Sequence, residues 1–190
     1  MGRKLGVTFA KITMQKRLTS ELGRMSPEEY ASSTKTPVWI ILENLRSAHN
    51  VGSFFRTADA FGCAGISICG YSARPPHKQL DKVALGSTES VPWIGFDHAT
   101  EAIAHAKEQG FFVLAIEQVH DALGLEDLPC PAAGIALVFG NEVDGVEPST
   151  LEACDQAIEI PQFGMKHSLN VSVCGGAVLW EATRRYRFGA

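Results

Sequence analysis

The sequence has no long hydrophobic run that would suggest a membrane protein. Its longest apolar stretches, such as Phe111 to Ile116, fall far short of the ~20 residues that cross a bilayer. The segment from Met1 to Arg24 is too polar to contain the apolar block of a secretory signal. We therefore expect a soluble, cytoplasmic protein with no membrane partner.

Patterns that would bind a metal are also missing. The five cysteines are widely spaced with no C-x-x-C pair, and their odd number argues against a disulfide framework. The six histidines form no H-E-x-x-H motif or other paired spacing. The sequence therefore predicts no metal site, a reducing compartment, and cysteines that act as small buried hydrophobes.

A net charge of −4 is unfavourable for binding a polyanion, but the charges are unevenly distributed along the chain. Residues 97–159 carry 13 Asp and Glu against one Lys, whereas residues 1–96 have a net charge of +5 and residues 160–190 of +3. A nucleic acid would be attracted to the two ends of the chain and repelled by its middle. Solvated charges that cluster by chance are the alternative interpretation.

Apolar runs that alternate with helical patterns predict an α/β fold with a mostly parallel sheet and helices on both faces. Strands are expected at Val38–Leu42, Gly65–Cys69, Phe111–Ile116, Ile135–Phe139 and Ala157–Ile160. Helices are expected at Phe54–Phe61, Asp81–Leu85, Ala99–Gln109, Pro148–Cys154 and Ser168–Tyr186. With 190 residues the chain is long enough for one well-buried core. We expect residues 1–36 to form a basic, helical N-terminal extension and residues 37–190 the main domain.

Ligands of parallel α/β sheets bind where strands end and helices begin, and one loop of this kind runs from His49 to Asp59. Here Asn50 and Ser53 suit the start of a helix. The guanidinium of Arg56 suits a phosphate or a developing oxyanion, although a lone helical Arg is more often a surface residue.

Two further loops follow later strands. In Val138 to Val146, Gly140 would let a ligand approach the backbone, although a Gly-Asn-Glu sequence is also an ordinary turn. In Ile160 to Val173, Ser168 suits a helix N-cap. That role does not explain the short polar residues Asn170 and Ser172, which alternate with apolar ones.

Together and in order, these three segments resemble the three sequence motifs of the SpoU family, the ribose-methylating branch of the trefoil-knotted SPOUT methyltransferases. The segments read H-N-V-G-S-F-F-R-T-A-D-A-F-G, V-F-G-N-E-V-D-G-V and I-P-x-x-G-x-x-x-S-L-N-V-S-V. The resemblance extends from about Val38 to the C-terminus. It implies a C-terminal trefoil knot, a homodimer, and methylation of a ribose 2'-hydroxyl in tRNA or rRNA with S-adenosylmethionine as cofactor.

The resemblance also assigns site residues. The implied catalytic residues are Asn50, Arg56, Glu142, Ser168 and Asn170, and the implied cofactor-binding residues are Gly140, Ile160 and Leu169. Cofactor binding mainly by backbone groups would explain why no G-x-G-x-x-G fingerprint is present. A guanidinium with a pKa above ~12 is a poor base, so we expect Arg56 to bind the adjacent phosphate and stabilise the developing alkoxide. The helical residues Val171 to Trp180 are expected to be mostly core.

The chain departs from the family pattern in two respects. Gln162-Phe163 replaces a short stretch that usually carries Met or Leu. The separate RNA-binding domain of many members has no counterpart, and the basic residues that would take its part are Arg3, Lys4, Lys11, Lys16, Arg17, Arg24, Arg184, Arg185 and Arg187. The last three of these also suit a helix C-terminus. The loop Tyr71 to Trp93, with Arg74, His77, Lys78 and Lys82, is expected to contribute selectivity.

Three other functions remain open. A SPOUT enzyme that methylates a base would be distinguished by nuclease digestion and mass spectrometry of the modified RNA. An RNA-binding protein that has lost catalysis would bind RNA but show no S-adenosylmethionine binding in calorimetry. A nucleotide-binding oxidoreductase is disfavoured because the glycine fingerprint is missing.

Overall fold

A computed structural model describes residues 14–23 and 25–189 and divides the chain into two compact units, Met1–Ser32 and Ser33–Ala190. The described part of the first unit contains a 3-10 turn, η1 (Thr19–Glu21), and a short helix, α1 (Pro27–Ser32). The second unit contains all three motif segments.

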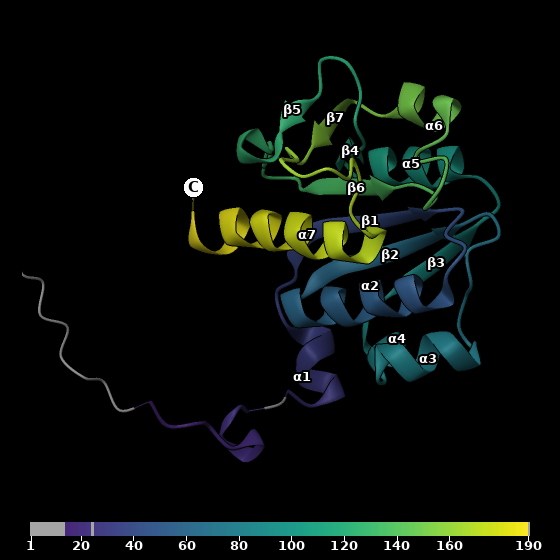
Figure 1. Cartoon of the computed structure of the whole chain (residues 1–190). Coiled ribbons are helices and arrows are strands. Elements are labelled where there is room, and N and C mark those ends of the chain that lie inside the picture. The colour runs from purple at the N-terminus through teal and green to yellow at the C-terminus, as the bar shows by residue number, and fades with distance from the viewer. Residues whose placement is uncertain (1–13, 24, 190) are drawn as a thin grey trace, which may run out of the picture. The chain divides into compact units, whose positions relative to one another are not determined.

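The second unit is built on a seven-stranded sheet in the order β3-β2-β1-β6-β4-β7-β5. All neighbouring strands are parallel, which confirms the predicted α/β fold (Figure 1). The strands are β1 (Thr36–Glu43), β2 (Cys63–Cys69), β3 (Trp93–Phe96), β4 (Phe112–Ile116), β5 (Leu123–Gly124), β6 (Ile135–Phe139) and β7 (Gln156–Glu159). The sequence did not predict β3 and β5, because both are short and neither is a continuous apolar run.

Helices cover both faces of this sheet (Figure 1). One face carries α2 (Ala48–Phe61), α3 (Lys78–Ala84), α4 (Ser87–Ser90) and α7 (Val171–Phe188), and the other carries α5 (Ala99–Glu108) and α6 (Pro148–Ala153). A 3-10 turn, η2 (Leu125–Asp127), follows β5. Among the described residues, no helix is long and apolar enough to cross a membrane.

The alternation of side chains along the central strands produces two separate cores. In β1, Ile40 and Leu42 pack in the core that includes residues of α2 and α7, whereas Ile41 packs in the core that includes residues of α5. Successive side chains of a strand point to opposite faces, so a strand buried on both faces reads as a continuous apolar run. Phe54 of α2 packs on Phe139 of β6, with ring centroids 4.9 Å apart.

The helix starts differ from the predicted ones, and this difference matters for the site. Helix α2 is capped by Ser47, whose side chain accepts a hydrogen bond from the Asn50 N–H, and not by Asn50 or Ser53. Helix α7 is capped by Asn170, which accepts from the N–H groups of Ser172 and Val173, and not by Ser168. The Asn50 side chain therefore lies in the first turn of α2 and is available for contacts with distant residues.

Helix α7 is less buried than the sequence predicted. Only one side of it packs on α2 and β1, through small and apolar residues such as Val178 and Leu179. Val173 is 60% exposed and Trp180 is 49% exposed, so the expectation that Val171 to Trp180 are mostly core is wrong for this face. Val173, Ala177 and Trp180 form an exposed apolar row, because their spacing places them on one side of the helix.

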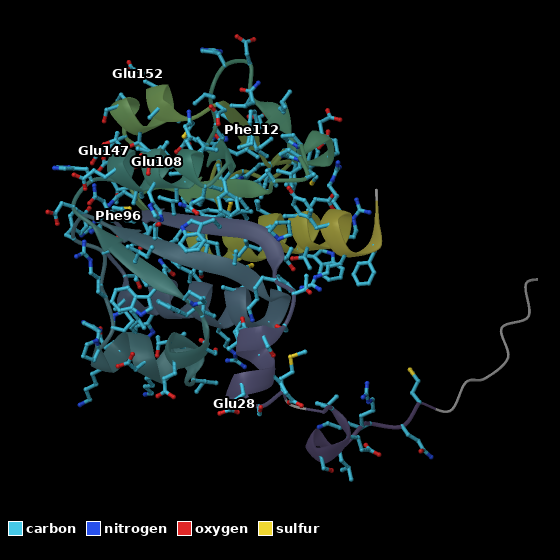
Figure 2. The ribbon with its side chains drawn as sticks, turned by 180° about the vertical axis from the view of Figure 1, so that it is seen from behind. Glu28, Phe96, Glu108, Phe112, Glu147 and Glu152 are labelled. Atoms are coloured by element: carbon cyan, nitrogen blue, oxygen red, sulfur yellow. The ribbon has the colours of Figure 1, made fainter. Side chains whose placement is uncertain are left out.

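The two faces of the molecule also differ in charge. Glu108 of α5, Glu152 of α6 and the α6 N-cap Glu147 are exposed and gather on one side of the sheet (Figure 2). On the opposite face, α3 exposes Lys78 and Lys82. The uneven charge along the sequence thus corresponds to a partial separation of charge in space.

Substitution of two adjacent glycines of α7 tests its contact with α2. A Cβ atom added at Gly175 would lie 2.3 Å from the ring of the buried Phe54, whereas a Cβ atom at Gly176 would meet nothing within 4 Å. Both Gly→Ala changes gain the same helix propensity. This gain therefore cancels when the free energies of unfolding of the two variants are compared. We expect Gly175→Ala to be less stable than Gly176→Ala by about 1–3 kcal/mol in urea unfolding. Equal stabilities would contradict the observed packing.

Candidate active site

A cleft of about 540 Å³ lies at the carboxyl edge of β6, β4 and β7. Its volume falls in the range of ~300–1,000 Å³ that is usual for small-molecule sites. The wall contains Phe139 and Gly140 at the end of β6, Glu117 after β4, Ile160 after β7, and residues 167–171 at the start of α7. Segments more than forty residues apart in the sequence therefore form one site.

All three predicted cofactor-binding residues, Gly140, Ile160 and Leu169, line this cleft. Of the five predicted catalytic residues, Glu142, Ser168 and Asn170 also line it, whereas Asn50 and Arg56 do not. The second and third motif segments thus form the wall, and the first segment borders it through α2.

Gly140 is also required by the packing of the chain's own loop. A Cβ atom at this position would lie 2.2 Å from the Gly145 carbonyl carbon and 2.3 Å from the Val146 nitrogen. The loop 141–146 turns back onto the end of β6, and Asn141 and Gly145 form an isolated bridge. The glycine therefore permits close approach of the chain's own loop, which in turn holds Glu142 at the cleft.

Hydrogen bonds join one residue from each of the three motif segments. The Glu142 carboxylate accepts from Asn50 Nδ2 at 2.8 Å, and Asn50 Oδ1 accepts from Asn170 Nδ2 at 3.3 Å. Glu142 also accepts from the backbone N–H groups of Arg46 at 2.8 Å and Ser47 at 3.1 Å. This Glu142–Asn50–Asn170 network connects the starts of α2 and α7 to the loop after β6.

The network keeps Glu142 ionised. Partial burial would raise the pKa of its carboxyl, but the hydrogen bonds from Arg46, Asn50 and Ser47 outweigh that effect and hold the pKa below its usual value. A carboxylate that accepts several N–H donors favours its charged form. Glu142 therefore acts in this structure as a charged hydrogen-bond acceptor that positions its neighbours.

Ser168 and Arg56 are outside this network. Ser168 is exposed at the cleft, and Arg56 is exposed on α2, on the same side of the helix as His49 and Ser53. Within residues 14–23 and 25–189, no hydrogen bond or ion pair is formed by either side chain. Both side chains are therefore available to a bound molecule.

Three residues of the site were not predicted. Asn141 donates to the Asn44 carbonyl at 2.8 Å and to the Tyr71 hydroxyl at 2.6 Å, which fixes the loop that carries Glu142. Gln118 donates to the His167 carbonyl at 2.7 Å, and Glu117 faces the same cleft. Glu117 and Gln118 could have been found from the sequence, because they are a polar pair that directly follows an apolar strand. Residues at that end of a parallel strand commonly bind ligands.

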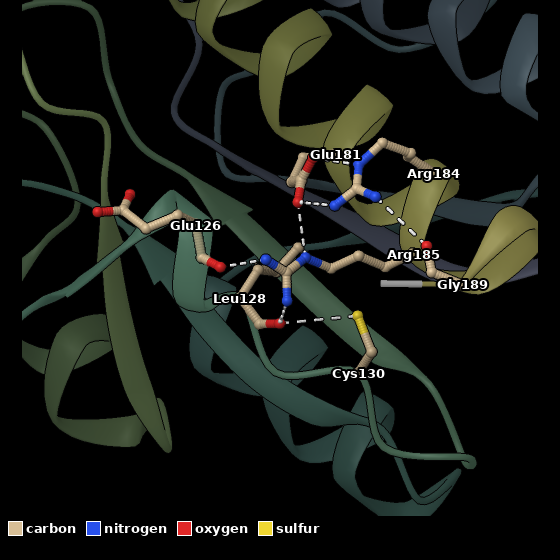
Figure 3. A network of polar contacts seen from close by, with 7 residues as sticks. All are labelled: Glu126, Leu128, Cys130, Glu181, Arg184, Arg185 and Gly189. Carbon is tan, nitrogen blue, oxygen red and sulfur yellow. Dashed lines mark hydrogen bonds and ion pairs between the residues drawn. The ribbon is translucent and has the colours of Figure 1, made fainter.

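The basic residues near the C-terminus bind the protein itself (Figure 3). Arg185 donates to the carbonyls of Glu126 and Leu128 and to Glu181. Arg184 also binds Glu181, and its hydrogen bond is the largest of the effects that lower the pKa of Glu181 to about 2. These contacts favour a structural role over the predicted RNA contact.

Arg187 is also used within the protein, since it binds the Thr34 carbonyl and the Thr36 hydroxyl. Of the predicted N-terminal RNA contacts, Arg3, Lys4, Lys11 and Arg24 lie outside the described residues. Lys16 and Arg17 are described, and Arg17 donates to the Glu21 carbonyl.

The predicted selectivity loop contains two kinds of basic residue. Arg74 donates to the Phe96 carbonyl, and the His77 side chain caps α3, so both help to fix the loop. Lys78 and Lys82 are exposed on α3 and are free of hydrogen bonds to other described residues. Of the four basic residues predicted for this loop, these two have side chains that are available to a bound partner.

Two further predictions, the absence of a metal site and the burial of the cysteines, can be compared with the described part of the chain. No group of three or more His, Cys, Asp or Glu residues there is arranged to hold a metal ion. Cys63 and Cys69 are buried as predicted, whereas Cys130 is exposed. Burial raises the pKa of Cys174, which lines the cleft, to about 11, so it is a neutral thiol at physiological pH.

The hydrogen bonds to Glu142 predict a pH-dependent contribution to stability. Because the pKa of Glu142 is lowered in the folded chain, this contribution is present above the pKa of the unfolded chain and is lost as pH falls through the folded-state value. We expect Glu142→Gln to lower the free energy of unfolding by about 1 kcal/mol at pH 7 and by less in acid.

Urea unfolding at several pH values measures this difference. Asp144→Asn is the matched control, because Asp144 is exposed in the same loop and its carboxylate accepts no hydrogen bond from the described residues. A Glu142→Gln effect that does not change with pH would contradict the role of the charge.

Comparison with known proteins agrees with the motifs. The model of the SpoU rRNA Methylase family matches residues 37–180. The chain is 31% identical over 182 residues to a 23S rRNA (guanosine-2'-O-)-methyltransferase, RlmB, of Vibrio vulnificus, covering 95% of this chain and 72% of that protein. It is 36% identical over 155 residues to the protein of the same name from Neisseria meningitidis, covering 81% of this chain and 60% of that protein.

Solved structures agree with the fold. An AdoMet-bound rRNA methyltransferase from Sinorhizobium meliloti has a TM-score of 0.73 at 25% identity, covering 82% of this chain and 58% of that chain. A TrmH/SpoU tRNA modifying enzyme from A. aeolicus has a TM-score of 0.74 at 28% identity, covering 84% and 80%. Several of these proteins are longer than this chain, which spans about three fifths of the Sinorhizobium structure. Motifs, site geometry and family match together show that the chain belongs to the SpoU rRNA methylase family.

Proposed function

We propose that this chain transfers the methyl group of S-adenosylmethionine to the ribose 2'-hydroxyl of a nucleotide in ribosomal RNA. The observation that carries the proposal is the Glu142–Asn50–Asn170 network, which joins the three family segments at one cleft. The names of the Vibrio and Neisseria relatives support ribosomal RNA as substrate and guanosine as the nucleotide. A ribosomal substrate also implies that the enzyme acts in the cytoplasm.

The cleft suits the cofactor. Bound S-adenosylmethionine supplies a methyl group on a positively charged sulfonium. Gly140, Ile160 and Leu169 hold the adenosyl part with backbone groups and apolar walls. Among the described residues, the acidic side chains that line the cleft are Glu117, Glu142, Asp144 and Glu159, with His167 and no Lys or Arg. An acidic wall favours a cationic ligand.

Arg56 provides the contact with RNA. Its guanidinium is exposed and free of contacts with other described residues, so binding a phosphate breaks no existing ion pair. Asn50, on the same helix, is held by Glu142 and Asn170, which fixes α2 relative to the cofactor. Arg56 binds the phosphate beside the reacting ribose and stabilises the developing alkoxide, while Ser168 orients the ribose.

The path of the chain is consistent with the trefoil knot of the family. Strand β7 lies next to the edge of the sheet, but α7 packs on β1 and α2 at its centre. The connecting residues 160–170 are held on one side by Gln118 at His167 and on the other by Asn50 at Asn170. We infer that this segment passes between the loops after β4 and β6 and so forms the knot.

The enzyme acts as a homodimer through the exposed apolar row of α7, formed by Val173, Ala177 and Trp180. Three apolar residues on one side of a helix are costly to leave in water. The row continues toward Leu169, which lines the cleft and is 44% exposed. A second copy that covers α7 therefore brings its RNA-binding surface close to this cleft.

The role of Arg56 is tested by Arg56→Lys, which keeps the charge and removes the planar fork. We expect kcat for RNA methylation to fall by about 10²- to 10³-fold. The Kd for S-adenosylmethionine, measured by calorimetry, should remain unchanged, since Arg56 does not line the cleft. Near-normal kcat in the variant would contradict this role.

The dimer is tested by Val173→Glu. The residue lies in the first turn of α7, where an acidic side chain is favourable for the monomer, so the change acts on the interface. We expect light scattering to show a monomer. Ile94→Glu is the matched control, because Ile94 is an exposed apolar residue of β3, and this variant should remain dimeric. A dimeric Val173→Glu protein would show that α7 is not the interface.

The substrate is tested by comparing 2'-O-methylation maps of rRNA and tRNA from cells with and without the gene. We expect one rRNA ribose to lose its methyl group when the gene is deleted. The structural likeness to the A. aeolicus tRNA modifying enzyme makes tRNA the second candidate. A change confined to tRNA would favour that candidate and overturn the rRNA assignment.

A further inference from the structure

Glu117 is an acidic residue of the cleft that the Glu142–Asn50–Asn170 network does not use. It directly follows β4, and its side chain reaches the loop 141–146, where Oε2 accepts a hydrogen bond from the Val146 N–H at 3.0 Å. The carboxylate lies against Gly145, because a Cβ atom added there would be 2.2 Å from Glu117 Oε2. Its other oxygen accepts from the Gln118 N–H at 2.8 Å.

The position of Glu117 is central in the cofactor cleft. The cleft is formed at the ends of β6, β4 and β7, and β4 is the middle strand of these three. Strands are about 4.8 Å apart, so the end of β4, which Glu117 follows, lies about 10 Å from the end of β1. Glu117 therefore lines the middle of the cleft, where a bound molecule can reach its carboxylate.

The hydrogen-bonding capacity of Glu117 is only partly used within the protein. An ionised carboxylate has about four acceptor sites, and the described residues donate two hydrogen bonds to it. Both of those donors are backbone N–H groups, of Gln118 and Val146, and they fix the position of the carboxylate. The remaining acceptor sites favour a ligand with hydroxyl or ammonium donors.

We propose that Glu117 is a cofactor-binding residue whose carboxylate accepts hydrogen bonds from S-adenosylmethionine. The donors on that molecule are the adenine 6-amino group, the two ribose hydroxyls and the α-ammonium group. The inference rests on the proposed function, since it requires that this cleft binds S-adenosylmethionine. It adds one side-chain contact to the backbone groups and apolar walls of Gly140, Ile160 and Leu169.

The test is calorimetric titration of the full chain with S-adenosylmethionine. Glu117→Gln keeps the size of the side chain and an oxygen for the Val146 N–H but removes the charge. We expect its Kd to rise by about tenfold. Asp121→Asn is the matched control, because Asp121 is exposed outside the cleft and its left-handed backbone, φ 63°, is one that Asn adopts readily. Its Kd should equal that of the wild type.

A second titration with 5'-methylthioadenosine, which lacks the amino-acid part, separates the two kinds of donor. If Glu117 binds the adenosyl part, through the ribose hydroxyls or the adenine 6-amino group, the variant loses affinity for this compound by a similar factor. If it binds the α-ammonium group, the variant and the wild type bind the compound equally. Either result, together with weaker binding of S-adenosylmethionine, supports the proposal.

The outcomes that overturn the proposal are distinct. Equal affinity of wild type and Glu117→Gln for S-adenosylmethionine would show that Glu117 makes no contact with it. A wild-type chain that binds no S-adenosylmethionine would overturn the proposed function itself. The melting temperature without ligand checks the fold. If Glu117→Gln fails to fold, Glu117→Asp, which shortens the side chain but keeps the charge, is expected to show the same loss of affinity.

Discussion

The Glu142 carboxylate is the acceptor that holds the site together. It accepts hydrogen bonds from the Arg46 and Ser47 N–H groups just before α2 and from the Asn50 amide in its first turn, and Asn50 in turn binds the cap of α7. Two helices that start about 120 residues apart are therefore positioned by one charged group. Because its pKa is lowered, the group is ionised at neutral pH and the arrangement holds under physiological conditions.

The sheet makes this interaction possible. Parallel strands bring the ends of β1, β6, β4 and β7 to one edge, and cores on both faces fix the helices that begin there. The same architecture separates charge, with acids around α5 and α6 and exposed lysines on α3. Arg56, Lys78 and Lys82 are therefore the exposed basic residues of the α2–α3 face that a phosphate backbone would contact. The proposed RNA binding rests on these local charges, because the net charge of the chain is −4.

The sequence predicted the central strands, because buried parallel strands are continuous apolar runs. Six of the eight residues that the family segments assign to the site line one cleft, whereas Asn50 and Arg56 do not. The sequence could not predict that Ser47 and Asn170 cap the two helices, since both residues are also held by hydrogen bonds to residues distant in the sequence, Glu142 and Asn50. It also missed the exposed row of α7, because periodicity alone does not show how much of a helix is covered. Glu117 was overlooked because it belongs to no family segment.

Methylation of a ribose is the reaction that distinguishes this site from its alternatives. To detect it directly, the purified chain is incubated with ribosomal RNA and S-adenosylmethionine that carries a deuterated methyl group, and the label is located by nuclease digestion and mass spectrometry. We expect the label on a ribose 2'-oxygen. Label on a base, or none in the presence of bound cofactor and RNA, would contradict ribose methylation by this site.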